Sequence, residues 1–116
     1  MILYPPFLKR GITIAPWLIL IPKWAKGSEP YHTHELIHVQ QQRNFGVLAF
    51  WWRYLTDKAF RQASEVDAYR AQVKAGDNLY VCAYSLSSGY KLDISVSQAL
   101  ELLGKPQDLF DRLRPL

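Results

Sequence analysis

Three histidines, the only ones in the chain, lie close together at His32, His34 and His38. The last two belong to a His-Glu-x-x-His motif in which Glu35 is the acid. On a helix, residues four apart lie on the same face, one turn from each other. Two imidazoles in that arrangement can both bind one zinc ion, at N–Zn distances of about 2.0–2.1 Å. Glu35 can then lean toward a water at the metal without being a ligand, and hydrolysis of a peptide bond needs such a base.

The motif also has a plainer interpretation, a solvated polar helix that carries two histidines by coincidence. Its context favours the metal site, because a helix start lies just before it. Ser28 offers a capping hydroxyl, Glu29 a first-turn acid, and Pro30 fits the first turn. We therefore expect a helix over about 29–44, with Gly46 near its end.

A catalytic zinc ion needs a third protein ligand and an open fourth position. Since no other histidine is suitably placed and the one cysteine stands alone, we expect a carboxylate. The downstream candidates are Glu65, Asp67, Asp77 and Asp93. Glu65 is favoured, because Ser-Glu-Val-Asp at 64–67 resembles a capping box and places this residue at the start of a helix. The alternative for Glu65 is an ordinary first-turn acid that complements the helix dipole.

The elements that must position these residues indicate an α+β fold. The Ile- and Leu-rich stretch bounded by Gly and Pro favours two short strands, with Ala15-Pro16 as a bend. The expected elements, in chain order, are strands within 11–22, a polar loop at 23–29, helices at about 29–44 and 47–60, a third helix from Ser64 to near Gly76, a segment at 77–92 that fits helix or strand, and a short amphipathic helix from near Ser95 to Gly104, with Pro106 beyond it.

The helix at 47–60 is apolar over most of its circumference. Its first stripe is Phe45, Leu48, Trp52, Leu55 and Ala59, and its second is Val47, Phe50, Trp51 and Tyr54. Most such residues form core, yet two stripes exceed what one helix of a small domain buries. The aromatic helix at 45–60 therefore also fits a contact with a second copy, a protein partner or a membrane surface. We expect self-association or partner binding through Trp51 or its neighbours on the second stripe.

Length and composition bound the remaining possibilities. With 116 residues, 49% apolar and 21% charged, the chain fits one globular domain over 1–116 rather than a disordered segment. Its net charge of +4 is scattered and forms no run, so nucleic-acid binding is not expected. The longest apolar stretch, 12–21, is too short and too interrupted for a membrane span. The start does not resemble a signal peptide, and Cys82 is most simply a buried small residue, so a reducing, cytoplasmic location is expected.

Three segments together resemble a known family. They are His34-Glu-Leu-Ile-His-Val-Gln-Gln41, Phe50-Trp-Trp-Arg-Tyr-Leu55 and Ser64-Glu-Val-Asp-Ala-Tyr-Arg70. The chain resembles the zincin metallopeptidases, in the gluzincin branch, and is most similar to small minigluzincin-like proteins of bacteria and phages over about 12–71. The resemblance implies a minimal zincin-like domain, with zinc held by His34, His38 and Glu65 and with Glu35 as general base. It also implies that a strand within 12–21 lies along the cleft as the edge that a peptide pairs with.

Two positions depart from the pattern of the family. The Asn-Pro that often precedes the ligand helix is replaced by Gln62-Ala63, and the Asp found four residues after the ligand Glu in thermolysin-like enzymes is replaced by Tyr69. Tyr69 lies one turn after Glu65 and can donate a hydrogen bond to a developing oxyanion. Its alternative is a packed tyrosine whose hydroxyl faces solvent. The chain also has no room for the extra helical domain of the larger enzymes, which predicts shallow substrate binding or a partner.

The sequence therefore predicts an enzyme, a zinc-dependent peptidase that acts on a peptide or protein substrate. The alternative is a non-catalytic interaction module with a zincin-like fold, with or without structural zinc. The intact Glu35 favours the enzyme, because a structural metal would not need it. His32 lies two residues before His34 and faces elsewhere on the helix, so we expect it to be a polar surface side chain.

Overall fold

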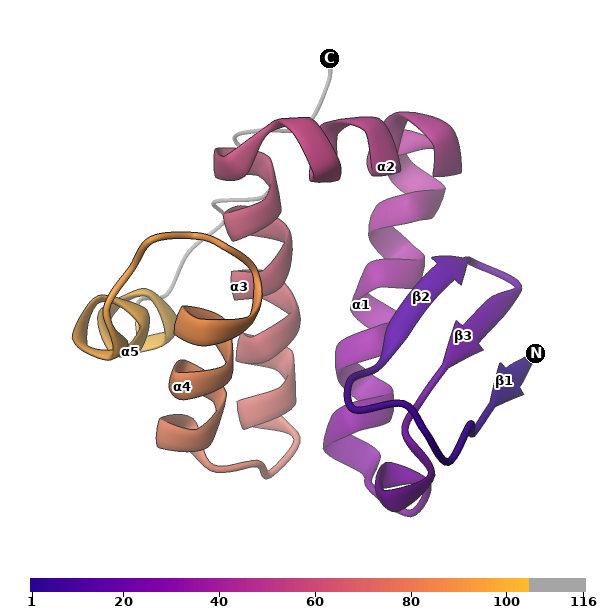
Figure 1. Ribbon diagram of the computed structural model, residues 1–116, viewed down its shortest axis with the longest axis horizontal. Helices are drawn as coiled ribbons and strands as arrows, with labels where there is room; N and C mark the ends of the chain where they lie inside the picture. Colours follow the sequence, from indigo (N-terminus) through magenta and orange to yellow (C-terminus); the bar gives the residue numbers. More distant parts are fainter. Residues whose placement is uncertain (105–116) are drawn as a thin grey trace.

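The computed structural model describes residues 1–104, and its architecture is α+β, as the sequence predicts (Figure 1). A small sheet packs against helix α1, and four further α-helices follow along the described chain. The helices are α1 (Glu29–Phe45), α2 (Val47–Thr56), α3 (Lys58–Lys74), α4 (Leu79–Gly89) and α5 (Val96–Gly104). No helix among them is long and apolar enough to cross a membrane. Pro106, which we expect beyond the last helix, lies outside the described residues.

The sheet has the strand order β1-β3-β2, with β1 (Ile2–Leu3) parallel to β3 (Leu18–Leu20) and β2 (Ile12–Ala15) antiparallel to it. The two strands expected within 11–22 are thus confirmed. The sequence did not predict β1, because its two exposed residues show no alternation and become a strand only by pairing with β3.

Strand β2 is an edge strand beside α1 (Figure 1). Thr13 and Ala15 are buried toward the interior, whereas Ile12 and Ile14 are partly exposed. A register shift between Thr13 and Ala15 interrupts the regular pairing with β3. The edge of β2 that faces away from β3 has no strand partner in the described sheet, and β2 packs against α1, the helix that carries the histidines.

Helix α1 begins and ends close to where the capping signals predict. The Ser28 hydroxyl accepts a hydrogen bond from the Tyr31 backbone N–H at 3.4 Å, and Gly46 follows the last turn at φ 83°. The expectation of a polar loop at 23–29 is wrong for the first half of this segment, because Lys23–Ala25 forms a 3-10 helix, η1. Ala25 is buried in the apolar cluster between the sheet and α1, so this turn belongs to the core.

The boundary between α2 and α3 differs from the prediction. Helix α2 ends at Thr56, and Asp57 caps α3 by accepting a hydrogen bond from the Phe60 N–H at 3.1 Å. The capping box expected at Ser64 is therefore wrong, because Ser64 lies within α3. Glu65 is consequently a buried residue in the middle of a long helix, and the first-turn interpretation of this acid is excluded.

The ambiguous segment at 77–92 contains a helix, α4, capped by the Asn78 side chain, which accepts from the Tyr80 N–H at 2.8 Å. The expected cap of α5 is confirmed, since the Ser95 hydroxyl accepts from the Gln98 N–H at 3.0 Å. Helices α3, α4 and α5 share the largest apolar cluster, in which Cys82 is buried as expected. Helices α4 and α5 lie on one side of α3, and α1 lies on the other side (Figure 1).

The two apolar stripes of α2 have opposite environments. Phe50 is buried, and the Trp51 indole N–H donates to the Ile14 carbonyl at 2.8 Å. The exposed large side chains belong instead to the first stripe, with Leu48 86%, Trp52 72% and Leu55 70% exposed, although Phe45 of that stripe is buried. Trp51 is half-buried against β2, so the first stripe offers more exposed apolar surface than the second, on which the sequence predicts the contact.

We predict that any self-association or partner binding through α2 depends on Trp52. Trp52→Glu places a charge on the exposed stripe and should abolish such a contact, while the free energy of unfolding changes by only about 0.5 kcal/mol, as is usual for a surface site. Sedimentation velocity over a range of protein concentrations measures the first effect and urea unfolding the second. Association that survives Trp52→Glu but is lost in a second charge variant elsewhere would place the contact on another face.

Candidate metal centre

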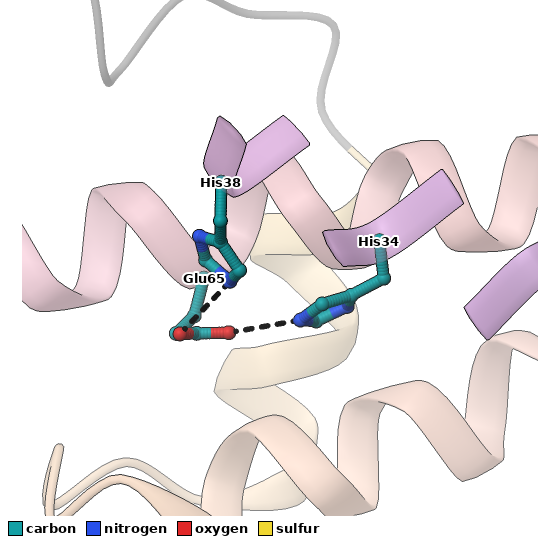
Figure 2. A group of neighbouring side chains, drawn as sticks. All are labelled: His34, His38 and Glu65. Carbon is teal, nitrogen blue, oxygen red and sulfur yellow. Dashed lines mark ion pairs between the residues drawn. The ribbon is translucent and has the colours of Figure 1, made fainter. Parts of the chain in front are cut away.

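His34 and His38 lie one turn apart on α1, and both imidazoles point toward Glu65 of α3 (Figure 2). His34 Nε2 lies 3.2 Å from Glu65 Oε1, and His38 Nε2 lies 3.3 Å from Glu65 Oε2. All three side chains are buried. The structure thus brings together the histidine pair and the carboxylate that the sequence favours.

The geometry of this group fits a divalent metal ion. One donor atom from each residue lies within 4.8 Å of the others. Two ligands held at about 2.1 Å from a tetrahedral ion are about 3.4 Å apart, close to the separations between the imidazoles and the carboxylate. Glu65 Oε1 is buried and has no hydrogen-bond partner within residues 1–104. A buried oxygen in that state is costly unless it is a ligand or stays in an ion pair.

The other carboxylate candidates are not brought into the group. Asp77 accepts a hydrogen bond from the Gln72 side chain at 2.6 Å, and Asp93 is exposed and pairs with Lys58 at 2.8 Å. Asp67 lines a separate surface hollow. Of the four acids considered from the sequence, only Glu65 shares a site with the histidines.

Two glutamines orient the imidazoles. Gln72 Oε1 lies 2.8 Å from His34 Nδ1, and Gln41 Oε1 lies 2.8 Å from His38 Nδ1. Because a carbonyl oxygen only accepts, each Nδ1 carries a proton, and Nε2 is the nitrogen that a metal ion could bind once any proton there is lost. Each of the two imidazoles on α1 is thus oriented by a glutamine side chain.

The glutamines are held in turn by their own partners. Gln41 accepts from the Ser64 hydroxyl at 2.7 Å and donates to the Ser64 carbonyl at 3.2 Å. Gln72 is anchored by its bond to Asp77. Neither glutamine was predicted from the sequence, although helical spacing offered a signal, since Gln41 follows His38 by three residues and Gln72 follows Glu65 by two turns.

Tyr54 of α2 positions the side chain of Glu65. Its hydroxyl donates to Glu65 Oε2 at 2.5 Å. Burial and the Glu65 charge raise the pKa of Tyr54 far above its ordinary range, so the phenol keeps the proton that it donates. With Oε2 engaged, Oε1 is the oxygen left for a metal ion.

Charge in the site is balanced between the carboxylate and the imidazoles. Burial alone would raise the pKa of the Glu65 carboxyl, but His38 and His34 together lower it below its ordinary value of 4.5. Burial alone would lower the pKa of His38, but the Glu65 carboxylate raises it to about 9. Metal binding must displace that His38 proton, so metal affinity should rise with pH up to this value.

These shifts predict a pH dependence for the metal-free protein. The raised pKa of His38 gives stability that is fully present below about pH 6.5 and is lost as pH rises through about 9. The lowered pKa of Glu65 gives stability that is present above about pH 4.5 and is lost in more acidic solution. We therefore predict that the melting temperature of the metal-free protein falls between pH 6.5 and pH 9. His38→Gln should show a flatter profile, and a wild-type melting temperature that rises over this interval would contradict the prediction.

Glu35 lies beside the group without belonging to it. Its Oε1 accepts a hydrogen bond from the Thr13 hydroxyl of β2 at 2.9 Å, and its Oε2 lies 3.8 Å from His34 Nε2. Gly11 lets the backbone before β2 approach this carboxylate, since a Cβ at Gly11 would lie 2.7 Å from Glu35 Oε2. The strand therefore positions the carboxylate, a contact that the sequence analysis did not find.

A pocket of about 160 Å³ opens onto these residues. Its walls combine the polar side chains of the site with Ile12, Phe50 and Trp51 from β2 and α2. Glu35, the two histidines and Glu65 all line it. A ligand in this pocket would therefore meet an apolar wall on one side and a carboxylate base beside a metal position on the other.

Tyr69 and Tyr90 form a pair next to His34. The Tyr69 ring packs edge-on against His34 with centroids 4.4 Å apart, and its hydroxyl lies 2.7 Å from the Tyr90 hydroxyl. Tyr90 lines the pocket at the metal position, whereas Tyr69 lines only the adjacent one. Arg61 holds the backbone of this region by donating to the carbonyls of Tyr90 at 2.9 Å and Tyr54 at 2.8 Å.

His32 has a contact at each of its ring nitrogens. It is half-buried, its Nδ1 lies 2.7 Å from the Ser28 carbonyl, and its Nε2 lies 3.0 Å from the Tyr4 hydroxyl. His32 is therefore a polar side chain that is partly, not fully, exposed. It faces away from the metal position, as its spacing from His34 predicts, and it lines neither pocket beside that position.

Comparison with known proteins gives no relative to reason from. No protein-family model, no curated protein and no solved structure matches this chain significantly. The geometry of the residues themselves therefore carries the functional argument.

Proposed function

We propose that this protein is a zinc-dependent peptidase with a minimal zincin-like fold of the gluzincin type. The observation that carries the proposal is the buried His34, His38 and Glu65 group with Glu35 beside it, at the wall of an open pocket. Two nitrogen ligands and one carboxylate oxygen, with a position left open, are typical of catalytic zinc. A structural zinc site would be closed by four protein ligands.

Within the site, zinc when bound supplies a Lewis acid that polarises a carbonyl and lowers the pKa of water. The chain's own base is Glu35. Its Oε1 is engaged by Thr13, which leaves Oε2, the oxygen nearer His34, to accept a proton and return it to the leaving amine. Burial holds this carboxylate in place, so little reorganisation is needed during reaction.

The substrate path that we propose runs along β2. An extended peptide can add to the outer edge of an edge strand through main-chain hydrogen bonds. At the far end, the Ile14 carbonyl is already bonded to Trp51, which closes the edge there. The segment nearest Glu35 is therefore where we expect the scissile bond, with an apolar side chain against Ile12, Phe50 and Trp51.

The test is zinc-dependent cleavage of a peptide mixture by the purified protein, followed by mass spectrometry. Cleavage should require about one equivalent of zinc, stop on chelation and return when zinc is restored. A folded, zinc-loaded protein that cleaves no peptide would favour the interaction module instead.

We predict that Tyr90 or Tyr69 assists the reaction by donating a hydrogen bond to the developing oxyanion. The two hydroxyls share one hydrogen bond, so one proton of the pair remains to be donated. Burial and the Glu65 charge raise the pKa of Tyr90, so its hydroxyl stays protonated at neutral pH. Because Tyr90 lines the pocket and Tyr69 does not, Tyr90→Phe should lower kcat about tenfold to a hundredfold and Tyr69→Phe less.

The matched pair of variants separates the two tyrosines. A larger loss in Tyr69→Phe would keep the oxyanion role that the sequence assigns to Tyr69. A loss confined to KM in both would show that the pair binds substrate without stabilising the transition state.

A further inference from the structure

A second pocket, of about 200 Å³, adjoins the first at the metal position. It shares four lining residues with the first pocket: Gly11, His34, Glu35 and Tyr90. Its other walls are more polar and carry two cations, Lys9 and Arg10, from the segment before β2. A peptide bond held at Glu35 would thus have an apolar pocket and a basic pocket within reach.

Arg10 is positioned by its contacts with Tyr90 and Gly89. Its guanidinium lies over the Tyr90 ring, 5.2 Å from the centroid. Gly89 lies at the end of α4, and a Cβ there would lie 1.4 Å from Arg10 Nη1. The guanidinium therefore occupies space that is free only because residue 89 is a glycine. The carbonyl end of a helix also favours a cation. Tyr90 lies between Arg10 and the candidate metal site, because it contacts Arg10 and lines both pockets.

Among the described residues, no acid neutralises either cation of the pocket. Within residues 1–104, Lys9 and Arg10 form no ion pair. Glu35 is the one carboxylate in the wall, and it is engaged by Thr13. Burial and the Asp77 carboxylate raise the pKa of Tyr31, while the Arg10 charge opposes this rise, so the field of Arg10 reaches into the pocket.

We propose that Arg10, assisted by Lys9, binds a carboxylate of the substrate next to the scissile bond. A guanidinium matches the planar geometry of a carboxylate and forms strong charge-assisted hydrogen bonds with it. The carboxylate is the free C-terminus of a short peptide or an acidic side chain, since both have the same chemistry. This inference rests on the proposed peptidase function, and it assigns the substrate class.

The test measures binding in the zinc-loaded Glu35→Gln protein, so that no probe is cleaved. Four probes share N-acetyl-Ala-Phe, whose Phe suits the apolar pocket: they end in Ala with a free carboxylate, in Ala amide, in Glu amide and in Gln amide. Isothermal titration calorimetry should show at least about tenfold tighter binding of the free acid over its amide, or of the Glu over the Gln probe. The first preference identifies the chain terminus as the source and the second the side chain.

The control variants decide whether Arg10 is responsible. A second substitution, Arg10→Gln, should abolish the preference, and Arg10→Lys should restore part of it. Arg43→Gln makes the same charge change at an exposed position on α1 that lines neither pocket, and it should have no effect. Equal affinity for all four probes, no binding of any of them, or a preference that persists in Arg10→Gln, as direct ligation of zinc would give, would overturn the proposal.

The binding result is independent of turnover. If the probes bind as expected but the wild-type protein cleaves none of them, the peptidase function fails while the carboxylate site stands. If the wild-type protein cleaves the acid and amide probes equally well, the carboxylate site fails while the peptidase function stands.

Discussion

Glu35→Gln is expected to lower kcat/KM for peptide hydrolysis at least about 10²-fold, the usual scale of general-base catalysis, while the protein keeps its fold and its zinc. The amide has nearly the volume of the carboxylate and can still accept the Thr13 hydrogen bond. It cannot take up a proton, so only the chemical step is lost. Glu35 lies outside the three-residue ligand group, and metal content should therefore match the wild-type value.

The matched control for this variant is Glu29→Gln. Glu29 is an exposed acid in the first turn of the same helix, so the substitution makes the same charge change away from the pocket. Activity should then stay close to that of the wild type. Equal activity in Glu35→Gln would remove Glu35 from the mechanism, and failure of that variant to fold would show that its burial beside Thr13 is structural.

Local signals explain how much of this site the sequence could predict. The spacing of His34, Glu35 and His38 is a property of one helix, and the caps at Ser28 and Gly46 fixed the bounds of that helix. Glu65 does lie beside the histidines, but not for the reason that the sequence suggested. It was expected to open a helix, but the capping acid is Asp57, and the apolar pattern continues through Ala59 and Phe60 without a Gly or Pro to mark the break.

The contacts that the sequence could not predict join elements distant along the chain. Tyr54 and Tyr90 approach the metal position from α2 and from the segment after α4, and no periodicity in either segment indicates that they meet. The pattern of α2 likewise shows two apolar stripes but not which one faces β2, since that depends on how the helix is rotated against its neighbours. The position of the Arg10 guanidinium depends on Gly89, and nothing in the sequence around Gly89 indicates that it lies against Arg10.

The wild-type protein is expected to bind one zinc ion per chain, and loss of any ligand should weaken binding by more than the 10–100-fold typical of outer-shell changes. The informative variants are Glu65→Gln and His38→Ala. Glu65→Gln replaces a charged ligand oxygen by a neutral one of similar size, and His38→Ala removes one of the two imidazoles. Elemental analysis after zinc reconstitution and dialysis measures the stoichiometry, and competition with a chromogenic chelator measures the affinity.

Asp67→Asn is the matched control for Glu65→Gln, because it removes a carboxylate from the same helix at a position outside the ligand group. It should bind zinc as the wild type does. Removing one partner of a buried ion pair commonly costs about 3–5 kcal/mol, so far-ultraviolet circular dichroism must show that each variant is folded before its zinc content is interpreted. Folded Glu65→Gln with undiminished zinc affinity would exclude Glu65 as a ligand and leave it as the ion-pair partner of His34 and His38. If the folded wild-type protein takes up no stoichiometric zinc, the three buried side chains form a structural ion pair and not a metal site, with the Tyr54 hydroxyl bound to Glu65 Oε2.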